Sequence, residues 1–239
     1  MKKFSLSITF VLLVIAAITL SIAATLTLKL PGDLSIARWI QQHHTGDWIK
    51  HITTLVSWIT EPEIVVFGAL AGIILLIRRK WIQAFALGAV LLTVLPVSTI
   101  KQLIDRPRPS SDLVNVLATS DSQSYPSGHV FLAVIIFGSI IYFANQIFGP
   151  NQRVIWLARV TLFFGIPDIG LSRIYKGVHW PSDVLGSFLI GSLALWISIR
   201  VYERFAAPVI ARVLVWVRLK NFAPEALAIS TEASTSVLR

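Results

Sequence analysis

The sequence of 239 residues contains no cysteine and only one methionine. The missing cysteines exclude disulfide bonds, thiolate catalysis and metal sites with cysteine ligands, so any chemistry has to come from other side chains. Charged residues are also scarce, at 14% of the chain, whereas hydrophobic residues make up 55%. Because a soluble domain of ordinary composition carries considerably more charge, this balance predicts an integral membrane protein.

Repeated apolar segments predict an all-α fold, a six-transmembrane-helix bundle. The first segment is longer than the hydrophobic stretch of a signal peptide, which favours a retained helix, while Ala23 and Ala24 leave signal cleavage open as the alternative. The six segments are residues 4–28, 62–77, 81–100, 130–148, 154–171 and 184–201.

Two segments outside these spans have a composition of their own. Residues 31–60 mix three tryptophans with polar residues, which predicts a short interfacial helical segment between the first two spans. Residues 1–205 are therefore expected to form one membrane domain. Residues 206–239 read as a basic amphipathic cytoplasmic tail with a disordered end.

The formal net charge of +9 indicates either a protein that binds nucleic acid or a membrane protein whose basic loops lie on the cytoplasmic side. With the N-terminus inside, six spans place residues 78–80, Arg153, Arg200 and Arg204 in or beside the cytoplasm, which satisfies the positive-inside rule. We therefore expect no nucleic-acid partner and two cytoplasmic termini. The same threading puts residues 29–60, 101–129 and 172–183 on the external face.

Three polar clusters lie in these external segments, and each has an ordinary structural explanation. Residues 101–109 resemble a juxtamembrane basic loop, and residues 125–129 read as a turn in which Ser127 caps a helix. Residues 172–183 read as a polar loop before a helix opened by Pro181. Taken together, however, the clusters supply cations, two histidines, a carboxylate and a helix N-terminus, which is a set suited to binding and transferring phosphate.

The ordered set of clusters resembles the three-part signature of the type 2 phosphatidic acid phosphatases, the PAP2 family. Six residues separate Lys101 from the pair Arg108-Pro109, the PSGH sequence occupies residues 126–129, and Ser172-Arg173 precede His179 and Asp183. The signature covers residues 101–183, about a third of the chain. The six-span layout is similar to that of the family's bacterial membrane branch.

The resemblance implies a metal-independent phosphatase without a cofactor that acts on lipid phosphates or diphosphates through a phosphohistidine. It implies that His179 is the nucleophile, that Asp183 orients its imidazole and that His129 protonates the departing oxygen. Elementary chemistry agrees, because a carboxylate beside an imidazole fixes its tautomer and stabilises the cation formed on attack. The implied phosphate ligands are Lys101, Arg108, Ser127, Gly128 and Arg173.

Several alternatives stay open at this point. Undecaprenyl diphosphate, phosphatidylglycerophosphate and phosphatidic acid all fit as substrates, and an external site slightly favours the prenyl diphosphate. A lipid phosphotransferase would differ only in the acceptor that resolves the phosphohistidine. A non-enzymatic anionic-lipid binder or a transporter is also an alternative, although apart from Arg159 and Asp168 the spans lack the polar path that a transporter needs. The bilayer of a bacterial inner membrane is the expected location, and the sequence does not set the oligomeric state.

Three features fall outside the signature. Arg106 repeats the Arg-Pro pair at the wrong spacing from Lys101, so we expect it to be a peripheral cation. Asp168 either pairs with a nearby cation or lines the mouth of the site. The adjacent His43 and His44 point apart and lack partner ligands, so no metal site is expected there.

Overall fold

The computed structural model describes residues 8–43, 61–206, 208–209 and 212. Every regular element in these described residues is a helix, which confirms the all-α class. The chain divides into two compact units, Met1–Ile197 and Ser198–Arg239. The elements are α1 (Ile8–Leu26), α2 (Asp33–His43), α4 (Glu61–Ile77), α5 (Trp81–Val90), η1 (Leu91–Val94), α6 (Leu95–Ile104), α7 (Gly128–Tyr142), α8 (Ala144–Phe148), α9 (Gln152–Tyr175), α10 (Pro181–Val201) and the π-helical turn η2 (Tyr202–Ala206).

Four helical stretches within the described residues are long and apolar enough to cross a bilayer: Ile8–Leu26, Trp81–Ile104, Gln152–Tyr175 and Pro181–Ala206. Helices α4 and α7 are apolar but shorter. The chain is thus an integral membrane protein with several spans. The count of six requires α4 and α7 to cross as well, and it stays a prediction.

Helix α7 forms the centre of the first unit. All its side chains from Val130 to Phe137 are buried. It packs against α4, α5 and α9, and Gly191 of α10 lets that helix approach Val134 closely. A helix that is apolar on all sides is typical of a buried position. Because other helices surround α7, its position in the bundle is fixed. Its N-terminal residues Gly128 and His129 are thereby fixed too.

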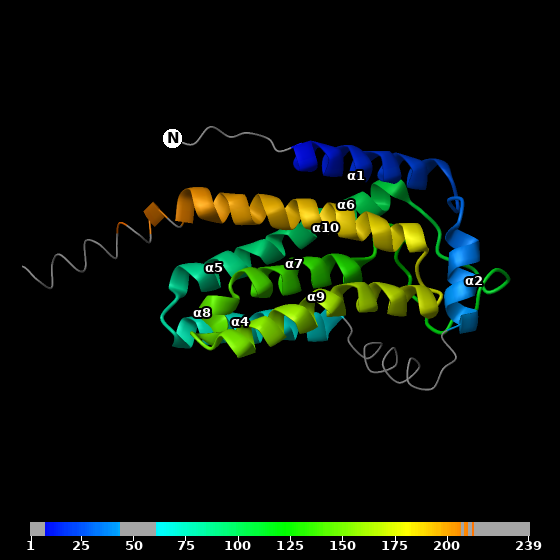
Figure 1. Cartoon of the computed structure of the whole chain (residues 1–239). Coiled ribbons are helices and arrows are strands. Elements are labelled where there is room, and N and C mark those ends of the chain that lie inside the picture. The colour runs from blue at the N-terminus through cyan, green and yellow to red at the C-terminus, as the bar shows by residue number, and fades with distance from the viewer. Residues whose placement is uncertain (1–7, 44–60, 207, 210–211, 213–239) are drawn as a thin grey trace, which may run out of the picture. The chain divides into compact units, whose positions relative to one another are not determined.

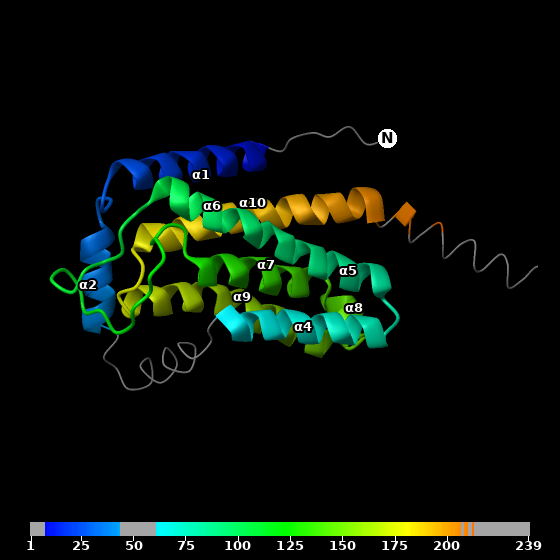
Figure 2. The same ribbon diagram turned by 180° about the vertical axis from the view of Figure 1, so that it is seen from behind.

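The polar clusters lie together at one end of the first unit. The C-terminal ends of α6 and α9, the N-terminal ends of α7 and α10, and helix α2 share this end in both views (Figures 1 and 2). The basic turn between α4 and α5 and the turn between α8 and α9 lie at the other end. The structure therefore separates the basic turns from the clusters along the bundle, as the threading requires.

Helix α2 occupies part of the segment predicted to lie at the interface, and it runs across the ends of the other helices (Figure 1). The Gln41 amide donates to the carbonyls of Asn115 (2.7 Å) and Tyr175 (2.9 Å), which ties α2 to the loops around the clusters. His43 Nδ1 lies 3.0 Å from the carbonyl oxygen of Trp39. Residues 44–60, including His44, lie outside the described residues, as does nearly all of the predicted tail 206–239.

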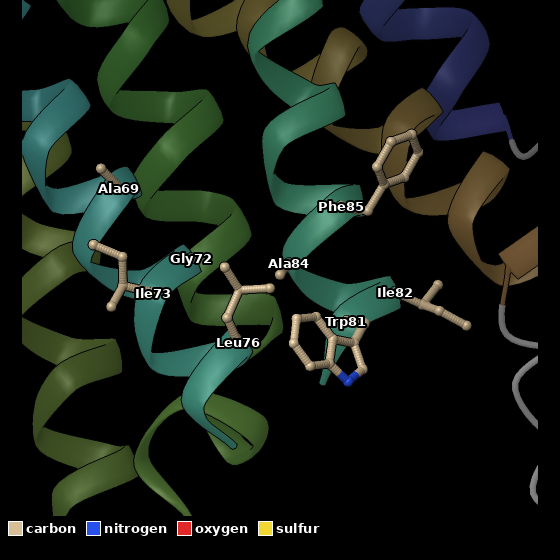
Figure 3. A pocket seen from close by; sticks show the side chains of 8 residues that line it. All are labelled: Ala69, Gly72, Ile73, Leu76, Trp81, Ile82, Ala84 and Phe85. Carbon is tan, nitrogen blue, oxygen red and sulfur yellow. The ribbon is translucent and has the colours of Figure 1, made fainter. Parts of the chain in front are cut away.

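An apolar groove lies between α4 and α5, close to the basic turn that connects them (Figure 3). The side chains of Trp81 and Phe85 are 62% and 79% exposed, as expected for positions that face lipid. No residue of the polar clusters is among the described residues that line it. The lining residues are Ala69, Gly72, Ile73, Leu76, Trp81, Ile82, Ala84 and Phe85.

Candidate active site

His179 is held in a short turn between two helices. Helix α9 ends at Tyr175, and Gly177 follows with a φ of 68°, where a side chain would collide with the Asn115 carbonyl. The Trp180 amide then donates to Asp183 Oδ2 at 2.8 Å as α10 begins. This turn was predicted as an external polar loop, but His179 is only 3% exposed. Packing against the neighbouring loops buries it.

The hydrogen bonds of His179 indicate its tautomer. Arg108 Nη1 lies 3.2 Å from His179 Nε2, and a guanidinium can only donate, so Nε2 is the acceptor. The proton of the neutral ring is then on Nδ1, which lies 3.7 Å from Asp183 Oδ2. That separation is longer than a hydrogen bond, so Asp183 acts on the ring by charge. An unprotonated Nε2 is the form in which histidine attacks phosphorus.

The surroundings of His179 favour its neutral form. Burial lowers the pKa of His179 to about 4; the Asp183 carboxylate opposes this shift, and the charges of Arg108 and Lys101 add to it. If neutral His179 is the nucleophile, the acid limb of kcat/KM, where the rate rises with pH, should lie near pH 4, below the ordinary histidine pKa of about 6.5. The check is a pH–rate profile corrected for ionisation of the substrate phosphate. An acid limb at or above 6.5 would contradict it.

The Asp183 carboxylate is completely enclosed. Its Oδ1 accepts from Arg106 Nη1 at 2.5 Å, and its Oδ2 accepts from the Ser124 hydroxyl and from the Trp180 amide. The expectation that Arg106 is a peripheral cation is therefore wrong, because this side chain is only 1% exposed. It also pairs with Asp33 Oδ2 at 2.8 Å. Arg106 is stable in the interior because its guanidinium pairs with two buried carboxylates.

The predicted phosphate ligands surround this pair at the same end of the bundle. Arg108 is anchored by the Ser122 carbonyl (2.7 Å) and the Val178 carbonyl (2.6 Å), which directs its Nη1 at His179. Lys101 donates to the Gln123 carbonyl at 2.7 Å, and its charge acts on His179.

The remaining cation and the second histidine come from the ends of α9 and α7. Arg173 is 5% exposed and contacts the Ser172 hydroxyl at 3.2 Å. His129 is half-buried, and it interacts electrostatically with Arg173, His179 and Arg108. The two histidines and three cations of the signature thus form one cluster.

Ser127 occupies the N-cap position of α7 with an extended backbone, but its hydroxyl makes no capping hydrogen bond. The hydroxyl oxygen is buried and has no hydrogen-bond partner among the described residues. Gly128 follows as the first residue of the helix. Of the two readings of this turn, helix cap and anion site, the unused hydroxyl favours the anion site.

Sequence reasoning missed two residues, Asp33 and Ser124, and misjudged Arg106. Asp33 follows Pro31-Gly32 at the start of α2 and reads locally as an ordinary first-turn acid. Nothing in the local pattern identifies its partners, which are 73 and 149 residues away in the sequence. Asp168 lies on α9 and is half-buried, which does not decide between its two predicted roles.

The fold and the cluster define a helical membrane protein with a buried histidine–carboxylate pair ringed by cations. The chain belongs to the PAP2 superfamily, whose profile matches residues 81–207. This confirms the predicted class of membrane lipid phosphatase, a hydrolase of phosphate esters.

Individual relatives are similar over most of the chain. Phosphatidylglycerophosphatase B of Bacillus subtilis is 28% identical over 162 residues, which cover 66% of this chain and 73% of that protein. Decaprenylphosphoryl-5-phosphoribose phosphatase of Mycobacterium tuberculosis is 29% identical over 165 residues, or 68% and 76% of the two chains. The crystal structure of a PAP2-type phosphatidylglycerolphosphate phosphatase from Bacillus subtilis superimposes with a TM-score of 0.69 at 22% identity, covering 82% of this chain and 96% of that one, and shows the same fold.

Proposed function

We propose that the protein removes phosphate from a polyprenyl diphosphate, with undecaprenyl diphosphate as the first candidate, through a phosphohistidine on His179. The observation that carries the proposal is the pairing around His179: Arg108 leaves Nε2 as an acceptor, and Asp183 faces Nδ1. This is the arrangement that a nucleophilic imidazole requires.

In the first step, His179 Nε2 attacks the terminal phosphorus and the bond from phosphorus to the bridging oxygen breaks. His129 gives its proton to that oxygen, and the prenyl phosphate leaves. Asp183 stabilises the positive imidazole that results. The three terminal oxygens are held by the cations Lys101, Arg108 and Arg173, the Ser127 hydroxyl and the Gly128 amide, which neutralise their charge as phosphorus becomes five-coordinate.

In the second step, His129 takes a proton from water, which attacks the phosphohistidine and releases inorganic phosphate. The bond between His179 Nε2 and phosphorus breaks, and both histidines return to their starting forms. No step requires a metal ion.

The location proposed for this reaction is the external face of a bacterial inner membrane, with both termini in the cytoplasm and six spans. The basic turn at residues 78–80 lies at the opposite end of the bundle from the site, which supports this orientation. The apolar surface of the helices would hold the prenyl chain beside the site. The polyprenyl-linked substrate in the name of the mycobacterial relative supports the lipid class. Residues 1–205 as one catalytic domain and 206–239 as a tail are part of the same proposal.

The phosphohistidine is tested by trapping. Undecaprenyl diphosphate labelled with 32P at the terminal phosphate is mixed with detergent-purified protein, quenched in alkali within milliseconds, and the protein is mapped by mass spectrometry. We expect the label on Nε2 of His179, chased away by water during turnover. Label on another residue, or rapid phosphate release with no labelled protein at any quench time, would contradict the mechanism.

A further inference from the structure

A network of buried charges continues beyond the carboxylate of Asp183. Asp183 Oδ2 faces His179, whereas Oδ1 pairs with Arg106 Nη1. Arg106 Nη2 in turn pairs with Asp33 Oδ2 at 2.8 Å. The three charged residues are at most 2% exposed. They form a continuous line from the imidazole to the first residue of α2.

Asp33 is bound firmly to the helix that carries Asp183. Its Oδ1 accepts from the backbone amide of Ser182 (2.9 Å), and its Oδ2 accepts from the Ser182 hydroxyl (2.7 Å). The Leu30 amide donates to Asp33 Oδ2 at 2.8 Å, which fixes the carboxylate from its own side. Arg106 Nη1 also donates to the Ser182 hydroxyl at 2.7 Å. The start of α10 is thus held by Asp33 and Arg106 together.

Charge and geometry both restrict what this network does. Burying three charged groups requires their desolvation, which costs free energy. Apolar side chains would link these helices without that cost, so stability alone does not explain the network. The planar guanidinium of Arg106 reaches both carboxylates from fixed directions, which a lysine ammonium does not reproduce. Through Oδ1, it restricts the rotation that would turn Asp183 Oδ2 away from His179.

We propose that Arg106 and Asp33 are positioning residues for the reaction: Asp33 orients Arg106, and Arg106 holds the Asp183 carboxylate facing His179. This inference rests on the proposed function of His179 as nucleophile. Neither residue belongs to the three-part signature, and Asp33 lies outside the segment 81–207 that the family profile matches. The positioning therefore depends on α2, the segment between the first two predicted spans.

Two conservative variants test the proposal. Arg106→Lys keeps the charge but loses the fork, and Asp33→Asn keeps the shape but loses the charge. For each variant we expect kcat per folded molecule to fall about 10- to 100-fold while KM changes by less than about threefold. The matched controls are Asp112→Asn, at an exposed position of the loop that follows Arg106, and Arg153→Lys, at the exposed start of α9. Both controls should stay within about twofold of the wild type.

Inhibition separates positioning from a structural role. Vanadate mimics five-coordinate phosphorus bonded to His179, so its inhibition constant should rise about as much as kcat falls, whereas that of inorganic phosphate should change little. If the variants only reduce the amount of folded protein and leave kcat and both constants unchanged, the positioning role is wrong. Asp33→Asn decides the question alone if Arg106→Lys is not recovered folded, because its side chain keeps the same shape.

His179→Ala, measured in parallel, distinguishes a failure of the proposed function from a failure of the positioning role alone. Turnover by His179→Ala near the wild-type rate would refute the proposed function itself. An inactive His179→Ala beside fully active, folded Arg106→Lys and Asp33→Asn would refute only the positioning role and leave the nucleophile in place.

Discussion

Replacing His179 with alanine is expected to lower kcat by about 10,000-fold or more, because the variant has no group that forms the phosphoenzyme. The remaining cations still bind phosphate, so the variant should retain substrate affinity within about tenfold. Initial rates of phosphate release and equilibrium binding of the labelled lipid give the two quantities separately.

The burial of His179 requires a control for folding, because removing a buried ring leaves a cavity. His43→Ala is the matched variant: it makes the same chemical change at an exposed position of α2. Size-exclusion elution and thermal unfolding of His179→Ala are compared with this control. A well-folded His179→Ala protein with a rate within tenfold of the wild type would remove His179 as the nucleophile.

Asp183→Asn is expected to have two effects, of which the larger is a fall in kcat of about 1,000- to 10,000-fold. An amide neither stabilises the imidazolium by charge nor favours the Nδ1–H tautomer. The rate is measured with the labelled diphosphate at the pH optimum of the wild type.

The second effect of Asp183→Asn is on stability. Arg106 loses one of its two buried carboxylate partners, and breaking a buried ion pair costs about 3 kcal/mol of unfolding free energy. His179→Ala leaves that pair intact and should be destabilised less. An Asp183→Asn variant as stable as the wild type, with a rate within tenfold of it, would show that the carboxylate neither orients His179 nor needs its bond to Arg106.

The sequence was sufficient to predict which residues of the signature gather at one end of the bundle. His179 and Asp183 are four residues apart at the start of a helix, and an apolar segment follows or precedes each cluster, so the topology alone brings them together. Hydropathy also identified the apolar helices, but not where they end. It extended the fourth segment to residue 148, whereas α7 ends at Tyr142 and a separate short helix follows.

The buried network could not be predicted, because it depends on contacts between residues far apart in the chain. Arg106 and Arg108 have nearly identical local sequences, yet Arg106 is buried against Asp33 and Asp183 while Arg108 faces His179. Both arginines follow a turn at Asp105, whose left-handed backbone (φ 46°) ends α6. No composition or spacing rule indicates that turn, and none identifies an aspartate in α2 as the partner.

The central claim is that the protein is a metal-independent phosphatase of polyprenyl diphosphates. It is tested most directly by phosphate release from a panel of detergent-solubilised lipids with and without EDTA. The panel contains undecaprenyl diphosphate, phosphatidylglycerophosphate, phosphatidic acid and diacylglycerol diphosphate. We predict the highest kcat/KM for undecaprenyl diphosphate, with no loss of rate in EDTA. No release from any lipid by the folded protein, or a rate that EDTA abolishes and added metal restores, would contradict the account.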